Sequence, residues 1–136
     1  AMFIVTLVRN PWDRLVSYYA WARSQDFAHP LISAAKSLDF AGFVQDPGVS
    51  AALRNSPARH YVTDAFGTER KAHFARLEHL RSDLLPLWDH LGFALEVPHP
   101  NRSDRQPGYR DYYDQKTANR AAELLAEDIE RFDYRF

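Results

Sequence analysis

The chain has 136 residues, of which 46% are hydrophobic and 26% charged, and its formal net charge is −1. The aromatic content and balanced charge exclude a disordered chain, and the lack of cysteine excludes disulfides, thiolate metal sites and a cysteine nucleophile. No apolar run approaches the ~18 residues of a membrane span, and no basic-then-apolar leader opens the chain. We therefore expect a single cytoplasmic domain over residues 1–136 with no membrane span.

The first expected element is a strand at residues 3–8. A continuous apolar, β-branched run of this kind is typical of a strand buried on both faces of a parallel sheet. Asn10 and Pro11 then carry the signals of an N-cap and a first helical position, and Asp13 suits the positive end of a helix. We expect a helix over residues 11–24 with one apolar face, formed by Leu15, Tyr18, Tyr19 and Ala22 and flanked by Trp12 and Trp21.

The remainder of the chain is expected to be mostly helical. Loops are predicted at residues 25–37 and 96–113, and a second short strand at residues 73–77. Helical segments are expected at residues 37–45, 49–54, 57–63, 82–91 (ended by Gly92) and 115–131. The fold class is therefore α/β, dominated by helices, with two or three short strands.

Arg9 is the first candidate for binding chemistry. It stands where the expected parallel strand ends and a helix begins, and ligands of open α/β sheets bind outside the carboxyl ends of the strands. The free N–H groups of a helix start and the guanidinium fork both suit an anion. Ser17 lies about 10 Å along the helix, where its hydroxyl can meet the same phosphate as a long arginine side chain. The alternative is equally open: Arg9 caps backbone carbonyls, and Ser17 faces its own helix.

These residues carry a resemblance to a known family. The segment Leu7–Tyr19 (LVRNPWDRLVSYY) resembles the 3′-phosphate-binding segment of sulfotransferases, which use 3′-phosphoadenosine 5′-phosphosulfate (PAPS) as sulfuryl donor. The resemblance implies that Arg9 and Ser17 hold the 3′-phosphate of PAPS, or of its product 3′-phosphoadenosine 5′-phosphate (PAP). Residues 74–80 are more loosely similar to the family's short strand and Glu-containing turn. Residues 99–103 and 109–113 resemble the late loop of the carbohydrate-type and bacterial branch, and residues 128–136 resemble its C-terminus. It implies further nucleotide contacts by Asn101, Arg102 and Ser103.

The family also has a P-loop-like segment that holds the 5′-phosphosulfate, and this sequence contains no match to it. Lys36, Lys71 and Lys116 have no neighbouring Gly-x-Ser/Thr loop, and the family's general base would precede Met2. The chain thus resembles the C-terminal portion of the P-loop-type sulfotransferase fold. It is a partial fold that lacks the 5′-phosphosulfate loop. The resemblance implies sulfuryl transfer from PAPS to a hydroxyl acceptor, a carbohydrate by its branch, but impaired in this isolated chain. Catalytic residues stay unassigned, and the strand at residues 3–8 is expected to offer an edge for a homodimer.

Other interpretations stay open. The chain can instead be a non-catalytic nucleotide-binding or interaction module on the same scaffold. Nucleic acid is not expected as a partner despite 14 arginines, because the charge is balanced and no helix is strongly basic. The histidines lack metal-ligand spacing, so no metal is expected. For Glu78 a structural ion pair is favoured over orienting a loop, and for Tyr112 and Tyr113 packing is favoured over stacking on adenine.

Overall fold

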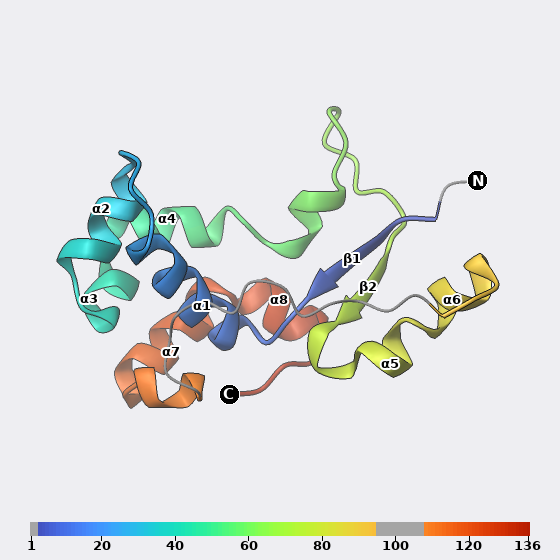
Figure 1. Ribbon diagram of the computed structural model, residues 1–136. Helices are drawn as coiled ribbons and strands as arrows, with labels where there is room; N and C mark the ends of the chain where they lie inside the picture. Colours follow the sequence, from blue (N-terminus) through green and yellow to red (C-terminus); the bar gives the residue numbers. More distant parts are fainter. Residues whose placement is uncertain (1–2, 95–107) are drawn as a thin grey trace. The chain divides into compact units, whose positions relative to one another are not determined.

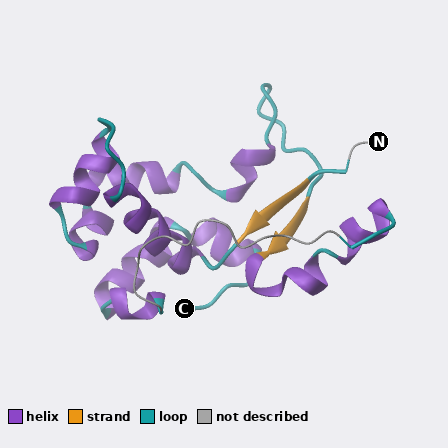
Figure 2. Cartoon of the chain, viewed as in Figure 1, coloured by secondary structure: helices purple, strands orange, loops and turns teal. Residues whose placement is uncertain are grey.

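The computed structural model describes residues 3–94 and 108–136 (Figure 1). Helices dominate these residues, and two short parallel strands form a small sheet (Figure 2), so the prediction of a helix-rich α/β chain is confirmed. The described residues divide into two compact units, one of residues 3–10 and 58–94 and the other of residues 11–57 and 108–136. The prediction of a single domain stays a prediction, and each unit is described by itself.

The first unit is built on the parallel pair β1 (Val5–Val8) and β2 (His73–Arg76). The register pairs Val5 with His73 and Val8 with Arg76, so both strands end at the same edge of the sheet. The strand predictions at residues 3–8 and 73–77 are confirmed in position. Between the strands this unit also contains the 3-10 helix η1 (Ala58–Val62) and an isolated antiparallel bridge from Thr63 to Glu69.

Burial of the first strand differs from the expectation. Within the described residues, β1 pairs with β2 alone, and its side chains are half-buried, with Leu7 47% exposed. The prediction of a strand buried on both faces is therefore wrong. An apolar run favours a strand, but only helices or strands packed on both faces can bury it. In the described sheet, only Ala75 of β2 is fully buried.

Between β2 and residue 94, the last described residue of this part of the chain, lie three short helical segments. They are the 3-10 helix η2 (Leu77–His79) and the helices α5 (Leu80–Asp83) and α6 (Leu85–Leu91). The expected helix over 82–91 is thus divided, and the break falls at Leu84. Pro86, in the first turn of α6, cannot donate a backbone hydrogen bond to the preceding turn, which favours a new helix start. Gly92 ends α6 with φ +80°, the left-handed cap that the sequence predicts.

The second unit is helical and is organised around α1 (Pro11–Arg23). This helix begins one residue after Asn10 and ends within one residue of the predicted boundary. Its buried side chains include Trp12, Leu15, Val16, Tyr19 and Ala22. The predicted apolar face is confirmed at Leu15, Tyr19 and Ala22, Val16 adds to it, and Tyr18 is half-buried. Trp21 lies at the edge of the core and is 45% exposed.

The segment after α1 corrects the expectation of a loop over residues 25–37. Residues 30–37 form the helix α2 (Pro30–Ser37). The ring Nδ1 of His29 accepts a hydrogen bond from the backbone N–H of Leu31 at 3.1 Å, and Pro30 occupies the first turn. His29-Pro30 is therefore a helix start, in which proline loses nothing because first-turn N–H groups have no helical partner.

Among the described residues, four further helices and one 3-10 turn belong to this unit. They are α3 (Phe40–Gln45), α4 (Pro47–Arg54), η3 (Tyr109–Tyr112), α7 (Gln115–Leu124) and α8 (Ala126–Arg131). Asp39, Asp46 and Asp114 cap α3, α4 and α7 by accepting backbone N–H hydrogen bonds. The expected helix over 115–131 is interrupted at Leu125, which is buried in the core with a non-helical φ of −111°.

Phe43 is the largest fully buried side chain in the unit, and it contacts the rings of Tyr18 and Tyr19.

The expected loop over 96–113 lies partly outside the described residues, and its end forms η3 rather than a loop. Within residues 3–94 and 108–136, no helix combines the length and the apolar character needed to cross a bilayer.

Candidate anion-binding site

Arg9 follows directly on the last residue of β1. Because Val8 is paired with Arg76, the carboxyl ends of β1 and β2 bring two arginines to the same edge of the parallel sheet. The carboxyl edge is where ligands of α/β sheets bind. The Arg9 side chain is half-buried, and the helix α1 begins two residues further along the chain. This strand, turn and helix arrangement is the one that the sequence predicts for an anion site.

The turn between Arg9 and α1 is hydrogen-bonded to the segment that follows β2. The backbone N–H of Asn10 donates a hydrogen bond to Glu78 Oε2 at 2.7 Å. Glu78 lies in η2, immediately after the end of β2. One carboxylate therefore ties together the two segments that leave the carboxyl edge, which is the loop-orienting role that the sequence left open beside a structural ion pair.

Arg76, the second arginine at this edge, forms a hydrogen-bonded ion pair with Asp83. Its Nε donates to Asp83 Oδ2 at 2.8 Å, its Nη2 to Oδ1 at 3.2 Å, and its backbone N–H to Oδ2 at 2.9 Å. These hydrogen bonds from Arg76 lower the pKa of Asp83 to about 2. The pair joins β2 to α5 across a turn. No sequence spacing rule predicts it, because the partners belong to two different elements.

Aromatic side chains hold the start of α1 within the helical unit. The indole N–H of Trp12 donates to the carbonyl of Ala118 at 3.1 Å, and the Tyr113 hydroxyl donates to the carbonyl of Trp12 at 2.7 Å. Burial raises the pKa of Tyr113, so its hydroxyl stays protonated. The ring of Tyr113 packs edge-on against Phe40 and Phe136. For these described contacts, the packing interpretation of Tyr113 is confirmed.

Tyr112 and the C-terminal Phe136 follow the same pattern. The Tyr112 ring packs edge-on against Phe40 with its centroid 5.7 Å away. Phe136 makes edge-on contacts with Trp12 and Tyr109. Aromatic packing around the first turn of α1 thus fixes the helix whose N-terminus is the predicted anion site.

Ser17 lies in the middle of α1, about 9 Å from Pro11 along the helix axis at 1.5 Å per residue. Its side chain is half-buried, and its hydroxyl makes no hydrogen bond to any residue that the structure describes. A helical serine commonly donates to the carbonyl four residues earlier. The Ser17 hydroxyl does not do so, which leaves its donor available within the described chain.

The predicted site residues fall into three parts of the chain. Arg9 belongs to the unit that contains the sheet, and Ser17 belongs to the helical unit. Asn101, Arg102 and Ser103 lie outside the described residues. The structure therefore confirms the elements on which Arg9 and Ser17 stand, and the joint binding of one phosphate stays a prediction.

Searches of protein-family models, curated proteins and solved structures found no match to this chain. The chemistry of the site therefore rests on its own residues. In the part of the chain that the structure describes, no group of three or more His, Asp or Glu side chains is placed to hold a metal ion. Among the described residues, Arg9 and Arg76 are the two arginines that the strand pairing brings to the carboxyl edge, and Arg76 is bound to Asp83.

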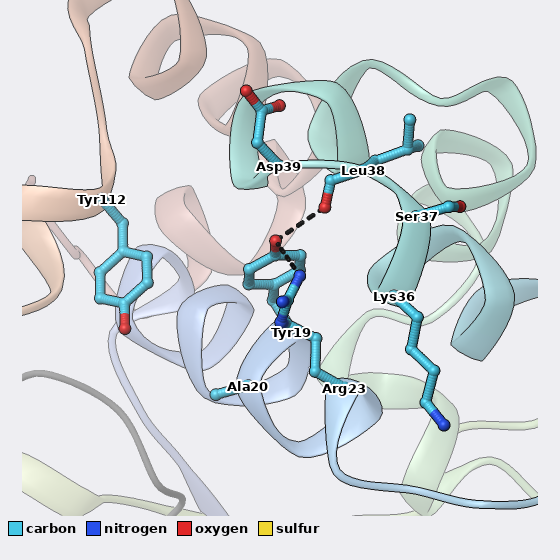
Figure 3. A pocket seen from close by; sticks show the side chains of 8 residues that line it. All are labelled: Tyr19, Ala20, Arg23, Lys36, Ser37, Leu38, Asp39 and Tyr112. Atoms are coloured by element: carbon cyan, nitrogen blue, oxygen red, sulfur yellow. Dashed lines mark hydrogen bonds between the residues drawn. The ribbon is translucent and has the colours of Figure 1, made fainter.

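Sequence reasoning missed a second feature, a pocket of about 550 Å³ at the C-terminal end of α1 (Figure 3). Side chains from α1, α2, the start of α3 and η3 line it, and all of them belong to the helical unit. The lining residues are Tyr19, Ala20, Arg23, Lys36, Ser37, Leu38, Asp39 and Tyr112. The false expectation of a loop over residues 25–37 concealed this pocket, since α2 forms one of its walls.

Proposed function

We propose that this chain binds the 3′-phosphate of a PAPS-type nucleotide and belongs to a sulfotransferase that transfers a sulfuryl group to a hydroxyl acceptor. In this proposal Arg9 and Ser17 hold the 3′-phosphate of PAPS or PAP. The observation that carries it is the β1–turn–α1 arrangement, which places Arg9 at the carboxyl end of a parallel strand just before a helix N-terminus. The resemblance of residues 7–19 to the family's 3′-phosphate segment supports the same ligand.

The site residues suit a phosphate by their chemistry. A guanidinium presents parallel N–H donors to two phosphate oxygens, and a serine hydroxyl adds a third donor. Asp13 lies in the first turn of α1 and opposes an anion there. The positive charge of Arg9 must outweigh this carboxylate, so we expect binding to depend strongly on Arg9.

The reaction proposed for the whole enzyme is an in-line displacement at sulfur. The acceptor hydroxyl oxygen forms a bond to sulfur as the bond between sulfur and the 5′-phosphate oxygen breaks. The acceptor proton passes to a general base, and PAP leaves with the electron pair of the broken bond. By analogy with phosphoryl transfer, the rate depends on positioning and on cations around the transferred group.

Arg9 and Ser17 act on the other end of the nucleotide. An interaction with the 3′-phosphate is the same in the ground state and in the transition state, so it contributes affinity and not rate. These residues therefore anchor the donor. The resemblance of residues 99–103, 109–113 and 128–136 to the carbohydrate-type branch supports a carbohydrate acceptor. The alternative of a non-catalytic nucleotide-binding module shares the same anchor.

Isothermal titration calorimetry with PAP tests the proposal. The matched ligand is adenosine 5′-monophosphate, which lacks the 3′-phosphate. We expect PAP to bind, and we expect Arg9→Ala to lower the affinity for PAP by about 10- to 100-fold. A loss of this size corresponds to one or two charged hydrogen bonds. Ser17→Ala should weaken PAP binding less, because a neutral donor contributes less.

Arg81→Ala is the control variant, since Arg81 is exposed in α5 and belongs to the same unit as Arg9. It should bind PAP as the parent chain does. Equal affinity for PAP and adenosine 5′-monophosphate, or equal losses in Arg9→Ala and Arg81→Ala, would show that the strand-end arginine does not bind a 3′-phosphate.

A further inference from the structure

The pocket at the C-terminal end of α1 contains Arg23, and among the described residues only its Nη1 nitrogen makes hydrogen bonds. Arg23 Nη1 donates to the Tyr19 hydroxyl and to the Ala35 carbonyl, each at 3.0 Å. The Tyr19 hydroxyl in turn donates to the Leu38 carbonyl at 2.8 Å (Figure 3). The guanidinium carbon lies 5.4 Å from the centroid of the Tyr19 ring. These contacts hold the guanidinium against Tyr19 of α1 and the Ala35 carbonyl of α2.

The remaining donors of Arg23 point to a particular ligand group. Its Nε–H and Nη2–H groups have no hydrogen-bond partner among the residues described. These two N–H groups run parallel along one edge of a guanidinium, and that edge matches the two oxygens of a carboxylate. The arginine is thus held by Nη1 while its bidentate edge stays available.

The charge of the pocket favours an anion. Lys36, on α2, lines the same pocket and forms no ion pair with any described residue. Asp39 is the one acidic residue in the lining, and its Oδ1 already accepts the N–H of Gly42 at 2.8 Å as the cap of α3. Two cations against one carboxylate leave the lining positive by one charge.

The other lining groups suit hydroxyls and a ring. The Ser37 hydroxyl donates to the Ser33 carbonyl at 2.6 Å, so its oxygen can accept a hydrogen bond from a ligand. Asp39 offers a second acceptor, and the half-buried Tyr112 contributes an aromatic surface. The volume of about 550 Å³ is within the usual range of small-molecule sites.

We propose that this pocket binds a small polyhydroxylated carboxylate, with Arg23 gripping the carboxylate side-on and Lys36 adding a second positive charge. The hydroxyl groups of the ligand donate to Ser37 and Asp39. The inference does not rest on the proposed function, because it uses none of the residues assigned to the nucleotide. A cation at the end of a helix can also serve only to offset the helix dipole, and the experiment separates these roles.

The probe is sodium glucuronate, titrated into the full chain by calorimetry at constant ionic strength, with glucose as the neutral analogue and inorganic sulfate as a second anion. We expect saturable binding of glucuronate and none of glucose. Arg23→Lys keeps the positive charge but removes the bidentate edge of the guanidinium. This variant should lower the affinity for glucuronate by at least about tenfold. Lys36→Gln should weaken it about threefold.

Lys116→Gln is the matched control for Lys36→Gln, because Lys116 is an exposed helical lysine of the same unit outside the pocket. It should leave the affinity unchanged. Should Arg23→Lys fail to fold, Lys36→Gln decides, since Lys36 is exposed and forms no ion pair with a described residue. Equal binding of glucose, equal binding of sulfate, or affinities unchanged in the pocket variants would each overturn the proposal.

Discussion

Asn10 and Glu78 join the two strand exits of the parallel sheet through a hydrogen bond of 2.7 Å, from the backbone N–H of one to Oε2 of the other. They are far apart in the sequence, and the parallel register brings them together. The residue before Asn10 is the proposed phosphate ligand, so Glu78 is a positioning residue for Arg9 and need not touch the nucleotide.

We expect Glu78→Ala to weaken PAP binding several-fold, because the freed turn must be ordered again on binding. Glu78→Gln keeps an acceptor oxygen and should restore most of the affinity. Calorimetric titration with PAP measures both variants. A direct electrostatic role would give the opposite result: removal of a carboxylate near an anion would raise the affinity in both variants alike.

The Arg76–Asp83 pair predicts a loss of stability in acid. Folding lowers the Asp83 pKa from 3.8 to about 2, so the folded state favours the ionised carboxylate. The contribution is fully present above pH 4 and is lost as the pH falls toward 2. Because the Arg76 side chain is 39% exposed, water screens the pair. We therefore expect the pair to contribute about 1–2 kcal/mol to the free energy of unfolding, less than the full pKa shift implies.

Asp83→Asn should therefore lower the free energy of unfolding by about 1–2 kcal/mol at pH 7 and flatten its change between pH 4 and pH 2. Urea unfolding at several pH values measures this. Asp89→Asn is the control, because Asp89 is an exposed residue of α6 in the same unit. The same pH profile in both variants would contradict a stabilising role for the pair.

The core of the helical unit depends on Phe43. It is fully buried and contacts the rings of Tyr18 and Tyr19 on α1. Phe43→Ala should destabilise the chain by about 3–5 kcal/mol through lost burial and the cavity left behind. Phe66→Ala, at a position 93% exposed, should change the stability by less than about 0.5 kcal/mol. Thermal and urea unfolding followed by circular dichroism compare the two, and similar losses would contradict the assignment of the core.

Local signals in the sequence explain what could be predicted. The apolar β-branched run and the Asn10-Pro11 boundary predict β1 and the start of α1, and the structure places both within two residues. The start of α2 was missed because His29 is an uncommon N-cap, and a proline in a polar segment is typical of a loop as well as of a helix start.

Non-local contacts explain what could not be predicted. Leu7 is exposed because burial depends on neighbouring elements, which a short apolar run does not specify. The link from Asn10 to Glu78 and the pair of Arg76 with Asp83 join separate elements and leave no periodic signal. The elements that carry the candidate site were thus predictable, whereas the contacts that orient it required the fold.

The first strand predicts an association of two chains. Within the described sheet β1 pairs with β2 alone, and Leu7 on it is 47% exposed. We expect two copies to pair through residues 3–8, because an apolar strand with one paired edge is a template for another strand. Light scattering at high concentration should detect a dimer, and Leu7→Lys should shift it toward the monomer. A monodisperse parent monomer at the same concentration would rule out this pairing.

The last prediction concerns catalysis by these 136 residues alone. None of Lys36, Lys71 and Lys116 stands beside a Gly-x-Ser/Thr loop of the kind that binds a 5′-phosphosulfate. An anchor for the 3′-phosphate stabilises bound donor and transition state equally, so it leaves the rate of the transfer step unchanged. We therefore expect the purified chain to bind PAP and yet to give no PAPS-dependent sulfation of a hydroxyl acceptor. The measurement is the release of PAP from PAPS with and without a saccharide acceptor, in a preparation whose PAP affinity has been determined. Turnover that requires the acceptor would show that the chain supplies its own cations to the transferred group. If kcat at saturating PAPS then fell in Arg9→Ala, the assignment of Arg9 to the far end of the nucleotide would be wrong, because an anchor changes the affinity and leaves kcat unchanged.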